Sequence, residues 1–467
     1  MSLTIHNNLT NKKEEFVPIE PGKVSMYVCG VTVYDDIHMG HARSMIVFDT
    51  VARYLRYLGY EVTHVTNFTD VDDKIINRAN ERGIGPLDLS AEYIKKYFED
   101  ASHLGINKAD LYPKASESID DIIDMVQTII KNGYGYTTPD GSVYFEVGKV
   151  KNYGRLSNQK LEDMQSSGRV VLDDQKKNPM DFAVWKTAKP GECTWDSPWG
   201  SGRPGWHIEC SAMIKRHLGD KIDIHGGGND LIFPHHENEI LQTEAVTGDV
   251  LANYWMHNGM LQVKDQKMSK SLGNFFKVED VAKKFDSQTI RFYFLNTHYS
   301  SPLIYGEEAI IESQTALKRL WNNYRDLKEH AKNGPSTDDD ITDLLEETRF
   351  GFTEAMNDDF NSRAAIEEMF QFVRSTNKAM NEKTLSSRSA AKAVLLLEEF
   401  DSILGVLPED NGADDETLDS VMKILIELRK ELRSRKQYDL ADAIRNKLGE
   451  AGVILEDTSD GAKWKKT

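Results

Sequence analysis

Apolar positions in the first part of the chain alternate between strand-like and helix-like spacing. Residues 24–34 are rich in Val, Met and Tyr, which is typical of a buried strand, and residues 42–58 repeat apolar side chains at helical spacing. A second strand is predicted at 61–66, followed by further helices. This alternation predicts the first half of a doubly wound α/β domain built on a Rossmann-type parallel sheet.

The pattern then changes along the chain. A helix at 119–131 and a glycine-rich hairpin after it predict an inserted subdomain, and a strand at 222–225 resumes the sheet. Later residues are helical in pattern, with acidic breaks at 338–340 and 414–416 that are typical of solvated linkers. We therefore expect a catalytic domain at 1–112 and 175–292, an insertion at 113–174, a helical bundle at 293–410 and a small C-terminal domain at 411–467.

Composition limits the class of protein. The 467 residues are 39% hydrophobic and have a mean hydropathy of -0.52, so the chain can bury substantial cores and is expected to be soluble. No apolar run approaches the ~20 residues of a membrane span, and the polar start lacks a signal-peptide core, so we expect a cytoplasmic protein with no membrane partner. Three scattered cysteines, Cys29, Cys193 and Cys210, leave free thiols or metal ligands rather than a disulfide framework.

Charge is spread unevenly. The formal net charge of -18 argues against nonspecific coating of nucleic acid. From residue 421 onward there are 11 Lys/Arg and 8 Asp/Glu, so this tail carries +3 and residues 1–420 carry -21. A specific nucleic-acid partner is therefore predicted at the tail, with Trp464 as a stacking surface. The alternative is a solvated basic helix with a tryptophan in the core.

A motif of two histidines and a glycine lies where the first strand gives way to the helix. In His38-Met39-Gly40-His41, Gly40 has no Cβ and lets a ligand approach the backbone, and the helix start carries the positive end of its dipole. The imidazoles of His38 and His41 can donate hydrogen bonds to a triphosphate. The alternative is a loop with two surface histidines, because four-residue patterns recur by chance.

Four residues have the types and spacing of a zinc site. Glu239 follows His235 by four residues, so on a helix both side chains face one side. Cys29, expected to close the first strand, and Cys210, expected to precede a helix, supply soft ligands. His236 is a rival to His235 that spacing does not separate, and two distant cysteines are also common as buried small hydrophobes.

A second motif, Lys267-Met268-Ser269-Lys270-Ser271, places two lysines in a short polar segment. Lysines on a loop can close over a polyphosphate and stabilise charge in the transition state. The alternative is an exposed basic turn. The two motifs occur together, in order, on either side of the insertion, which favours one shared function over two chance matches.

These motifs resemble the HIGH and KMSKS sequences of the class I aminoacyl-tRNA synthetases, and the closer match is to the cysteinyl-tRNA synthetases. Met39 stands where the family has Ile, and Val31 where Pro is common; neither change affects a charged contact with phosphate. The resemblance covers nearly the whole chain and rests on segments 27–30, 67–74, 181–186, 195–210, 225–239 and 356–361.

The resemblance implies ATP-dependent ligation of L-cysteine to tRNA(Cys) through a cysteinyl-adenylate, with Mg²⁺ accompanying ATP. It also implies one Zn²⁺ that selects cysteine over serine, because a thiolate binds zinc far better than a hydroxyl does. A monomer with a C-terminal anticodon-binding domain is expected. The residues implied are His38, Gly40, His41, Gly227 and Lys270 for ATP, His38, His41, Lys267 and Lys270 for catalysis, Thr69, Trp206 and Asp230 for cysteine, and Cys29, Cys210, His235 and Glu239 for zinc.

Two other functions could use the same core. One is a ligase that joins cysteine to a small amine, against which a tail suited to tRNA argues. The other is a nonenzymatic tRNA-binding paralogue, against which the two intact motifs argue.

Overall fold

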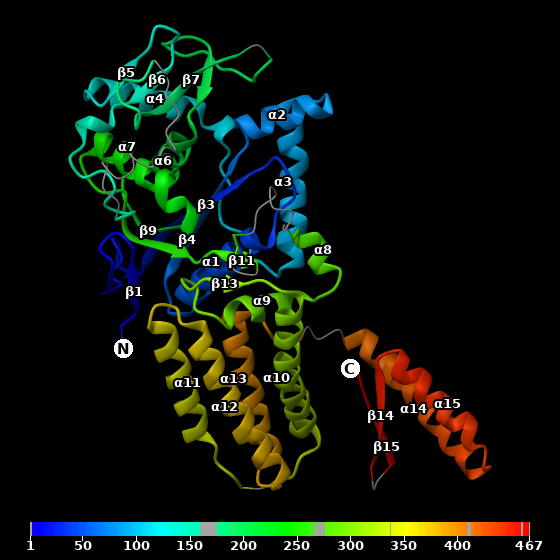
Figure 1. The fold of residues 1–467 in the computed structure, drawn as a ribbon. Helices are drawn as coiled ribbons and strands as arrows, with labels where there is room; N and C mark the ends of the chain where they lie inside the picture. Colours follow the sequence, from blue (N-terminus) through cyan, green and yellow to red (C-terminus); the bar gives the residue numbers. More distant parts are fainter. Residues whose placement is uncertain are drawn as a thin grey trace. The chain divides into compact units, whose positions relative to one another are not determined.

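The structure is a computed structural model that describes residues 2–158, 175–189, 191–263, 266–267, 276–336, 338–408, 412–458 and 461–466. The chain divides into two compact units, Met1–Leu407 and Pro408–Thr467, and each is described by itself. The elements are labelled in Figure 1. Among the described residues, none of the helices combines the length and apolar character needed to cross a membrane.

Four parallel strands form the central sheet of the first unit, in the spatial order β10-β9-β3-β4. They are β3 (Lys23–Thr32), β4 (Glu61–Thr69), β9 (Ile222–Gly228) and β10 (Ala252–Asn258). Along the chain the four strands follow the order β3, β4, β9, β10. β4 pairs with one edge of β3 and β9 pairs with the other, so the direction in which strands are added reverses between β3 and β9. In open α/β sheets ligands bind at such a switch point, outside the carboxyl ends of the strands.

Helices cover both faces of this sheet, as a parallel sheet requires. Met26 and Val28 of β3 belong to the core that includes α1 (Met39–Tyr57), whereas Tyr27 packs with residues of α6 (Trp206–Leu218). The Rossmann-type fold predicted from the sequence is thus confirmed, with α1 beginning three residues before the predicted helix. The sequence missed β10 and the N-terminal hairpin of β1 (Thr4–Asn7) and β2 (Lys12–Glu15).

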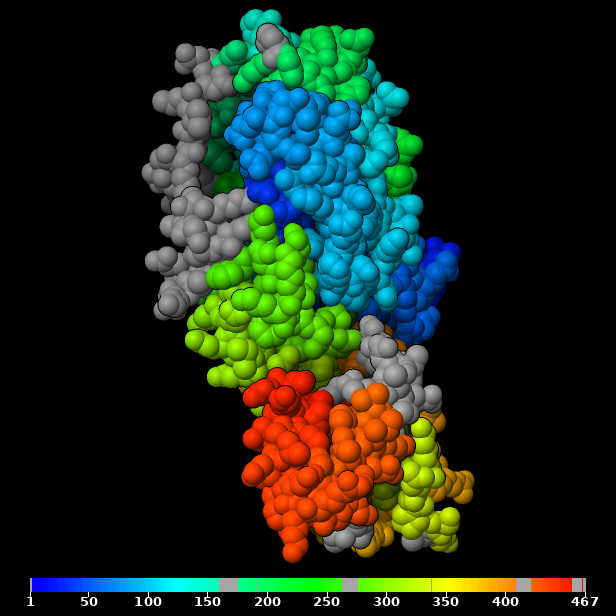
Figure 2. All heavy atoms as spheres, turned by 90° about the vertical axis from the view of Figure 1, so that its right-hand side faces the viewer, coloured from blue at the N-terminus to red at the C-terminus, as the bar shows by residue number. Residues whose placement is uncertain are grey.

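An antiparallel sheet in the order β5-β6-β7-β8 joins two strands of the expected insertion, β5 and β6, to two strands that follow residue 175, β7 and β8. Its strands are β5 (Gly135–Thr137), β6 (Val143–Phe145), β7 (Phe182–Thr187) and β8 (Gly202–Pro204), next to α4 (Ile119–Lys131), which matches the predicted helix. Two helices, α2 (Asp73–Arg82) and α3 (Pro86–His103), follow β4. In Figure 2 they form the lighter blue surface in the upper part of the visible face, and α8 (Val278–Ala282), in green, adjoins α3.

Four long helices make up the bundle of the first unit and lie side by side in Figure 1: α10 (Glu307–Asn333), α11 (Thr342–Asn357), α12 (Ser362–Asn381) and α13 (Ser387–Leu404). Arg291 of α9 (Ser287–Leu295) joins this bundle to the sheet. Its buried guanidinium pairs with Asp49 of α1 at 2.6 Å and donates to the Leu404 carbonyl at 2.8 Å. These two contacts therefore fix the bundle to α1.

The second unit contains α14 (Gly412–Ser434), α15 (Tyr438–Glu450) and an antiparallel hairpin of β14 (Val453–Thr458) and β15 (Gly461–Lys466). The sequence predicted both helices and a single strand-like end. Trp464 packs against a small core of Met422, Val453 and Leu455, and Arg429 is buried. This packing favours the core alternative for Trp464, and it removes Arg429 from the exposed basic face of α14.

Candidate functional site

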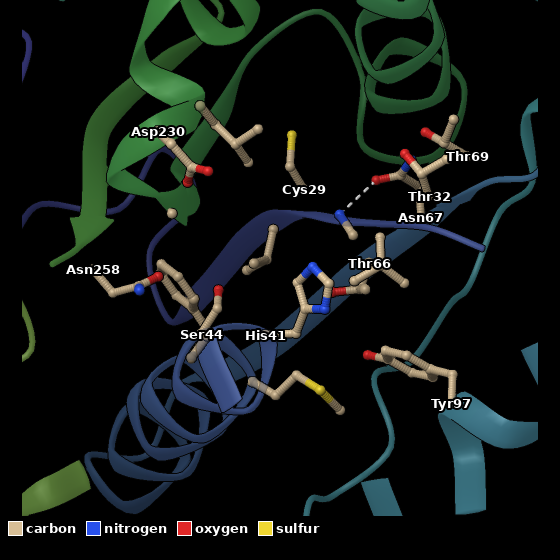
Figure 3. Close-up of a pocket in the computed structure, with 18 of the residues that line it drawn as sticks. Cys29, Thr32, His41, Ser44, Thr66, Asn67, Thr69, Tyr97, Asp230 and Asn258 are labelled. Atoms are coloured by element: carbon tan, nitrogen blue, oxygen red, sulfur yellow. Dashed lines mark hydrogen bonds between the residues drawn. The ribbon is translucent and has the colours of Figure 1, made fainter. Parts of the chain in front are cut away.

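A cavity of about 300 Å³ lies at the carboxyl ends of the parallel strands. In Figure 3 Cys29 lies between Asp230 on one side and Asn67 and Thr69 on the other, with His41 on α1 below. The backbone N–H of Gly30 donates to Asn67 Oδ1 at 2.9 Å, the dashed line of the figure. Nine residues named from the sequence line this cavity: Cys29, His38, Gly40, His41, Thr69, Trp206, Cys210, Asp230 and His235.

Gly227, expected beside ATP, is not among the described residues that line the cavity. Instead it provides room for a histidine ring, because a Cβ at Gly227 would lie 2.9 Å from His236 Cε1. The next residue, Gly228, does line the cavity together with Asn229. At the carboxyl end of β9, Gly227 therefore makes room for the His236 ring behind the cavity, and Gly228 lines the cavity itself.

The four expected metal ligands meet at one point. Cys29 Sγ lies 3.7 Å from Cys210 Sγ and 3.5 Å from Glu239 Oε1; His235 Nε2 lies 3.6 Å from Cys210 Sγ and 3.0 Å from Glu239 Oε1. Around a tetrahedral zinc ion these separations would be about 3.8 Å between two sulfurs, about 3.6 Å from sulfur to nitrogen or oxygen, and about 3.3 Å from nitrogen to oxygen. The donor set and its spacing fit one four-coordinate ion.

Two of these ligands differ in position from the sequence prediction. Cys210 lies inside α6, in its second turn, rather than before a helix. Cys29 lies within β3 rather than at its end, where the pairing with β4 shifts between Val28 and Val31. Cys29 shares a face of β3 with Tyr27, the face that packs on α6, so a strand and a helix contribute the two sulfurs.

The cluster is electrostatically suited to a cation. Burial raises the pKa of the Cys29 thiol well above its ordinary range. A hydrogen bond with Cys29 lowers the pKa of Cys210, but burial and the Glu239 charge outweigh it and the pKa is raised. Burial lowers the pKa of His235 to about 3, which keeps the imidazole neutral, the form that binds metals. A bound cation would supply the positive charge that buried thiolates need.

A second group of donors overlaps the first. His225 Nε2 lies 2.8 Å from Glu239 Oε2, and His236 Nε2 lies 3.2 Å from Cys29 Sγ, so Cys29, His225, His236 and Glu239 also converge. Both histidines of the His235-His236 pair thus reach the cluster. The sequence analysis placed His225 at the end of a predicted strand but not among the candidate ligands.

The motif His38-Met39-Gly40-His41 forms the start of α1. His38 is the N-cap: its Nδ1 accepts from the His41 backbone N–H at 3.2 Å, and His41 Nδ1 accepts from the His38 N–H at 3.3 Å. The rings stack with centroids 3.7 Å apart. Because each Nδ1 accepts, a neutral ring carries its hydrogen on Nε2, which makes Nε2 the donor that each ring can offer.

At the start of α1, two of the backbone N–H groups that could face an anion already have hydrogen-bond partners within the protein. The Met39 N–H donates to the Phe276 carbonyl at 3.0 Å, and the His41 N–H bonds to His38. These two backbone donors are therefore used within the protein. The histidine side chains, rather than those two amides, are the groups that can serve an anion at this end of the pocket.

Residues expected to hold the amino acid lie around the metal cluster. The Trp206 ring stacks on His235, with centroids 4.3 Å apart, and Asp230 is exposed at the cavity. Thr69 Oγ1 donates to Glu209 Oε2 at 2.9 Å. Glu209, which the sequence analysis missed, is buried, and burial raises its pKa well above the usual range. Thr69 is thus held in place by a buried acid behind the pocket.

The lysine motif is only partly described. Lys267 ends the short strand β12 (Gln266–Lys267), whose backbone pairs with β11 (Leu261–Val263) opposite Gln262. Lys270 lies outside the described residues. After the motif the chain lies beside the segment that precedes α1, where Lys277 Nζ pairs with Asp36 at 2.6 Å and the Val278 N–H donates to the Ile37 carbonyl. The chain after the motif therefore contacts the residues just before His38.

Comparison with known proteins identifies the family. Residues 15–315 match the family model described as the tRNA synthetases class I (C) catalytic domain, and residues 351–408 match the DALR domain. The cysteine–tRNA ligase of Carboxydothermus hydrogenoformans is 48% identical, covering 99% of this chain and 100% of that protein. The chain belongs to the cysteine–tRNA ligase family. The member from Clostridioides difficile is 47% identical over the same shares of each chain.

Solved structures outside the cysteine–tRNA ligase family share the fold. Methionyl-tRNA synthetase of Mycobacterium tuberculosis, in complex with methionyl-adenylate, aligns with a TM-score of 0.64 at 15% identity, covering 82% of this chain and 92% of that one. The family's catalytic model spans the central sheet, both motifs and all four clustered ligands, while the DALR domain corresponds to the last part of the bundle.

Proposed function

We propose that the protein ligates L-cysteine to tRNA(Cys) in an ATP-dependent reaction through a cysteinyl-adenylate, and that zinc coordination of the cysteine thiolate selects the amino acid. The observation that carries this proposal is the convergence of Cys29, Cys210, His235 and Glu239 beside a cavity whose other side holds His38 and His41. One cavity thus joins a thiol-binding group to a site suited to polyphosphate.

On the phosphate side, the protein acts by donating hydrogen bonds. The cysteine carboxylate attacks the α-phosphorus of ATP, the bond to the bridging oxygen breaks, and pyrophosphate leaves with its Mg²⁺. His38 and His41 donate from Nε2 to the phosphate oxygens as charge moves onto the leaving group. Lys267 and Lys270 add positive charge to the same oxygens. Such oriented donors act most strongly in the transition state.

On the cysteine side, selection and orientation are separate tasks. Cys29, Cys210, His235 and Glu239 would hold zinc, which when bound supplies a soft Lewis acid that favours a thiolate over a hydroxyl. Asp230 pairs with the substrate ammonium group, while Thr69 and Trp206 line the pocket. An apolar pocket alone would separate near-isosteres by only about 1–3 kcal/mol, so metal coordination accounts for specificity without an editing step.

The second step needs the tRNA. The 3'-terminal hydroxyl of the tRNA attacks the adenylate carbonyl and AMP leaves, so the protein must place the acceptor end at the cavity. We assign the second unit to the anticodon end, on account of the net charge of +3 that its residues from 421 onward carry within an acidic chain. Four basic residues of this stretch remain candidates once Arg429 is buried: Lys430, Arg433, Arg435 and Lys436. A monomer suffices for this arrangement.

The test is cysteine-dependent exchange of pyrophosphate into ATP, followed by charging of tRNA(Cys), with metal content measured on the same preparation. We expect exchange with cysteine and far less with serine. A chain cut after Leu407 should keep exchange, because the cavity lies wholly in the first unit, and its kcat/KM for charging should fall by about 100-fold or more. No exchange with cysteine would overturn the function, and unchanged charging by the cut chain would overturn the anticodon role.

A further inference from the structure

A row of hydrogen-bonding side chains leads from Cys29 away from the cavity to the N-terminal hairpin. His236 Nε2 lies 3.2 Å from Cys29 Sγ, and His236 Nδ1 lies 2.8 Å from His257 Nε2. His257 Nδ1 in turn lies 3.0 Å from Asn8 Oδ1. We call Asn8, His257 and His236 the histidine chain. Neither His257 nor Asn8 has a role in the proposed reaction.

The members of the histidine chain are held in position. Both rings are buried, at 0% and 3% exposure for His236 and His257. The absence of a Cβ at Gly227 makes room for His236, and the Asn8 N–H donates to the Trp255 carbonyl at 2.9 Å, two residues before His257 on β10. The backbone thus fixes the row, and only the hydrogens and the Asn8 amide can differ between states.

Each ring carries a single hydrogen. His236 Nδ1 and His257 Nε2 lie 2.8 Å apart, so only one of these two nitrogens carries a hydrogen, and both rings are buried, where a charge is costly; both imidazoles are therefore neutral. A neutral imidazole donates from one nitrogen and accepts at the other. The hydrogens of the histidine chain must therefore all point toward Asn8 or all point toward Cys29.

The two directions suit different forms of Cys29. With the Asn8 carbonyl facing His257, as in this structure, both rings carry hydrogen on Nδ1, and His236 Nε2 accepts from a Cys29 thiol. With the Asn8 NH₂ facing His257, both rings carry hydrogen on Nε2, and His236 donates to Cys29. A metal-bound thiolate only accepts, so it requires the second direction.

We propose that Asn8 is a positioning residue of the metal site: in the metal-loaded protein its NH₂ group faces His257, so that His236 Nε2–H donates to the Cys29 thiolate. The inference rests on the proposed function only in taking zinc as the ion at Cys29. An amide is suited to this place because it can present either a donor or an acceptor after a half-turn about one bond. A carboxylate could only accept.

A competing arrangement makes the proposal specific. If the ion were held instead by Cys29, His225, His236 and Glu239, the lone pair of His236 Nε2 would face the ion, and both rings would carry hydrogen on Nδ1. The two arrangements differ in the tautomer of the same two histidines. The tautomer therefore reports both the direction of the histidine chain and the ligand set.

The first measurement is long-range ¹H–¹⁵N correlation on full-length, zinc-loaded protein labelled at histidine nitrogen, with His257→Phe to assign its signals. Hydrogen on Nε2 of both His236 and His257 is expected. Hydrogen on Nδ1 of His236 in zinc-loaded protein would overturn the inference while leaving zinc binding intact. Protein that takes up no zinc would overturn the inference and the zinc part of the proposed function together.

The second measurement is zinc affinity by competition with a chromophoric chelator. Partners beyond the ligands typically change metal affinity 10–100-fold, so we expect a loss of about 10-fold for Asn8→Leu, which removes the donor, and more for His257→Phe. Tyr254→Phe is the control, because it breaks hydrogen bonds between β10 and the N-terminal segment without touching the histidine chain. Equal affinities in Asn8→Leu and Tyr254→Phe would contradict a positioning role for Asn8.

Discussion

The two sides of the cavity are built in different ways. The phosphate side is local: His38 and His41 lie three residues apart and bond to each other's backbone at the start of one helix. The metal side is assembled from distant segments, since Cys29 comes from β3, Cys210 from α6, and Glu239 from α7 (Glu237–Thr247). The phosphate side therefore depends only on the start of α1, whereas the metal side requires the assembled sheet and its helices.

Close packing shows how much the metal side depends on the fold. A Cβ at Gly30, beside Cys29, would lie 1.7 Å from the Asn67 carbonyl oxygen of the neighbouring strand. A Cβ at Gly226 would lie 2.4 Å from the Phe48 ring of α1. Only glycine allows β3, β4, β9 and α1 to approach this closely. The difference between the two sides can be tested by substitutions that act on one side at a time.

The largest expected effect comes from Cys29→Ser on the metal side. A serine hydroxyl is a poor zinc ligand, and Cys29 belongs to both overlapping groups of donors, so neither group can hold the ion. Zinc affinity should fall by more than about 100-fold, the upper range for partners that do not even touch a metal. The KM for cysteine in pyrophosphate exchange should rise, and discrimination against serine should weaken.

Elemental analysis and pyrophosphate exchange on the same samples provide the measurement. Cys210→Ser is the informative companion, because it breaks the first donor group and leaves Cys29, His225, His236 and Glu239 in place. Cys193→Ser is the control, since Cys193 lies in neither group. Full zinc content in Cys29→Ser would show that the metal side is not a zinc site.

The second-largest expected effect distinguishes the helix-capping role of His38 from its proposed role as a hydrogen-bond donor to phosphate. Asn is a favoured N-cap residue, so His38→Asn should keep the start of α1 and change unfolding free energy by less than about 0.5 kcal/mol. It removes the imidazole donor, and the loss of one oriented donor typically lowers kcat about 100-fold. His38→Ala should show the same loss of rate and, in addition, a loss of about 1 kcal/mol in stability.

Thermal unfolding and single-turnover adenylate formation measure the two quantities on the same variants. The zinc content of both variants should equal that of the wild type, because the metal side does not depend on the cap. A normal rate in His38→Asn would mean that His38 serves only as a helix cap and has no part in binding phosphate.

The same contrast explains what the sequence could predict. The motif at 38–41 and the strand and helix around it follow from local spacing, and the structure has them within a few residues. The metal ligands could be named by type and by the four-residue step from His235 to Glu239. Their assembly could not be derived, because it depends on the strand order β10-β9-β3-β4, which no local pattern specifies.

The missed residues have a common physical reason. β10 was not predicted, so His257 at its carboxyl end was not placed beside the metal cluster, and the N-terminal hairpin that carries Asn8 was not predicted either. Glu209 lies next to Cys210 in the sequence, but its contact with Thr69 joins a helix to a strand 140 residues away. Such contacts are set by packing between layers rather than by the spacing of residue types.

The smallest expected effect is the contribution of one buried histidine to acid sensitivity. Burial lowers the pKa of His257 to about 3, below its value of about 6.5 in an unfolded chain. Between these values only the unfolded chain takes up the proton, so the stabilising effect is complete above pH 6.5 and is lost as pH falls toward 3. One such group costs about 1.4 kcal/mol per pH unit, or about 2 kcal/mol between pH 6.5 and pH 5.

Unfolding free energies of chelator-treated protein at pH 7 and pH 5 measure this contribution, with metal removed so that its release does not add to the slope. His257→Phe should lose less stability between the two pH values than the wild type does, by about 2 kcal/mol. Tyr254→Phe, on the same strand, should keep the wild-type slope, because the phenol does not titrate in this range. An identical slope in His257→Phe would mean that acid destabilises the protein through groups elsewhere, and would separate the acid sensitivity of the fold from the metal side of the cavity.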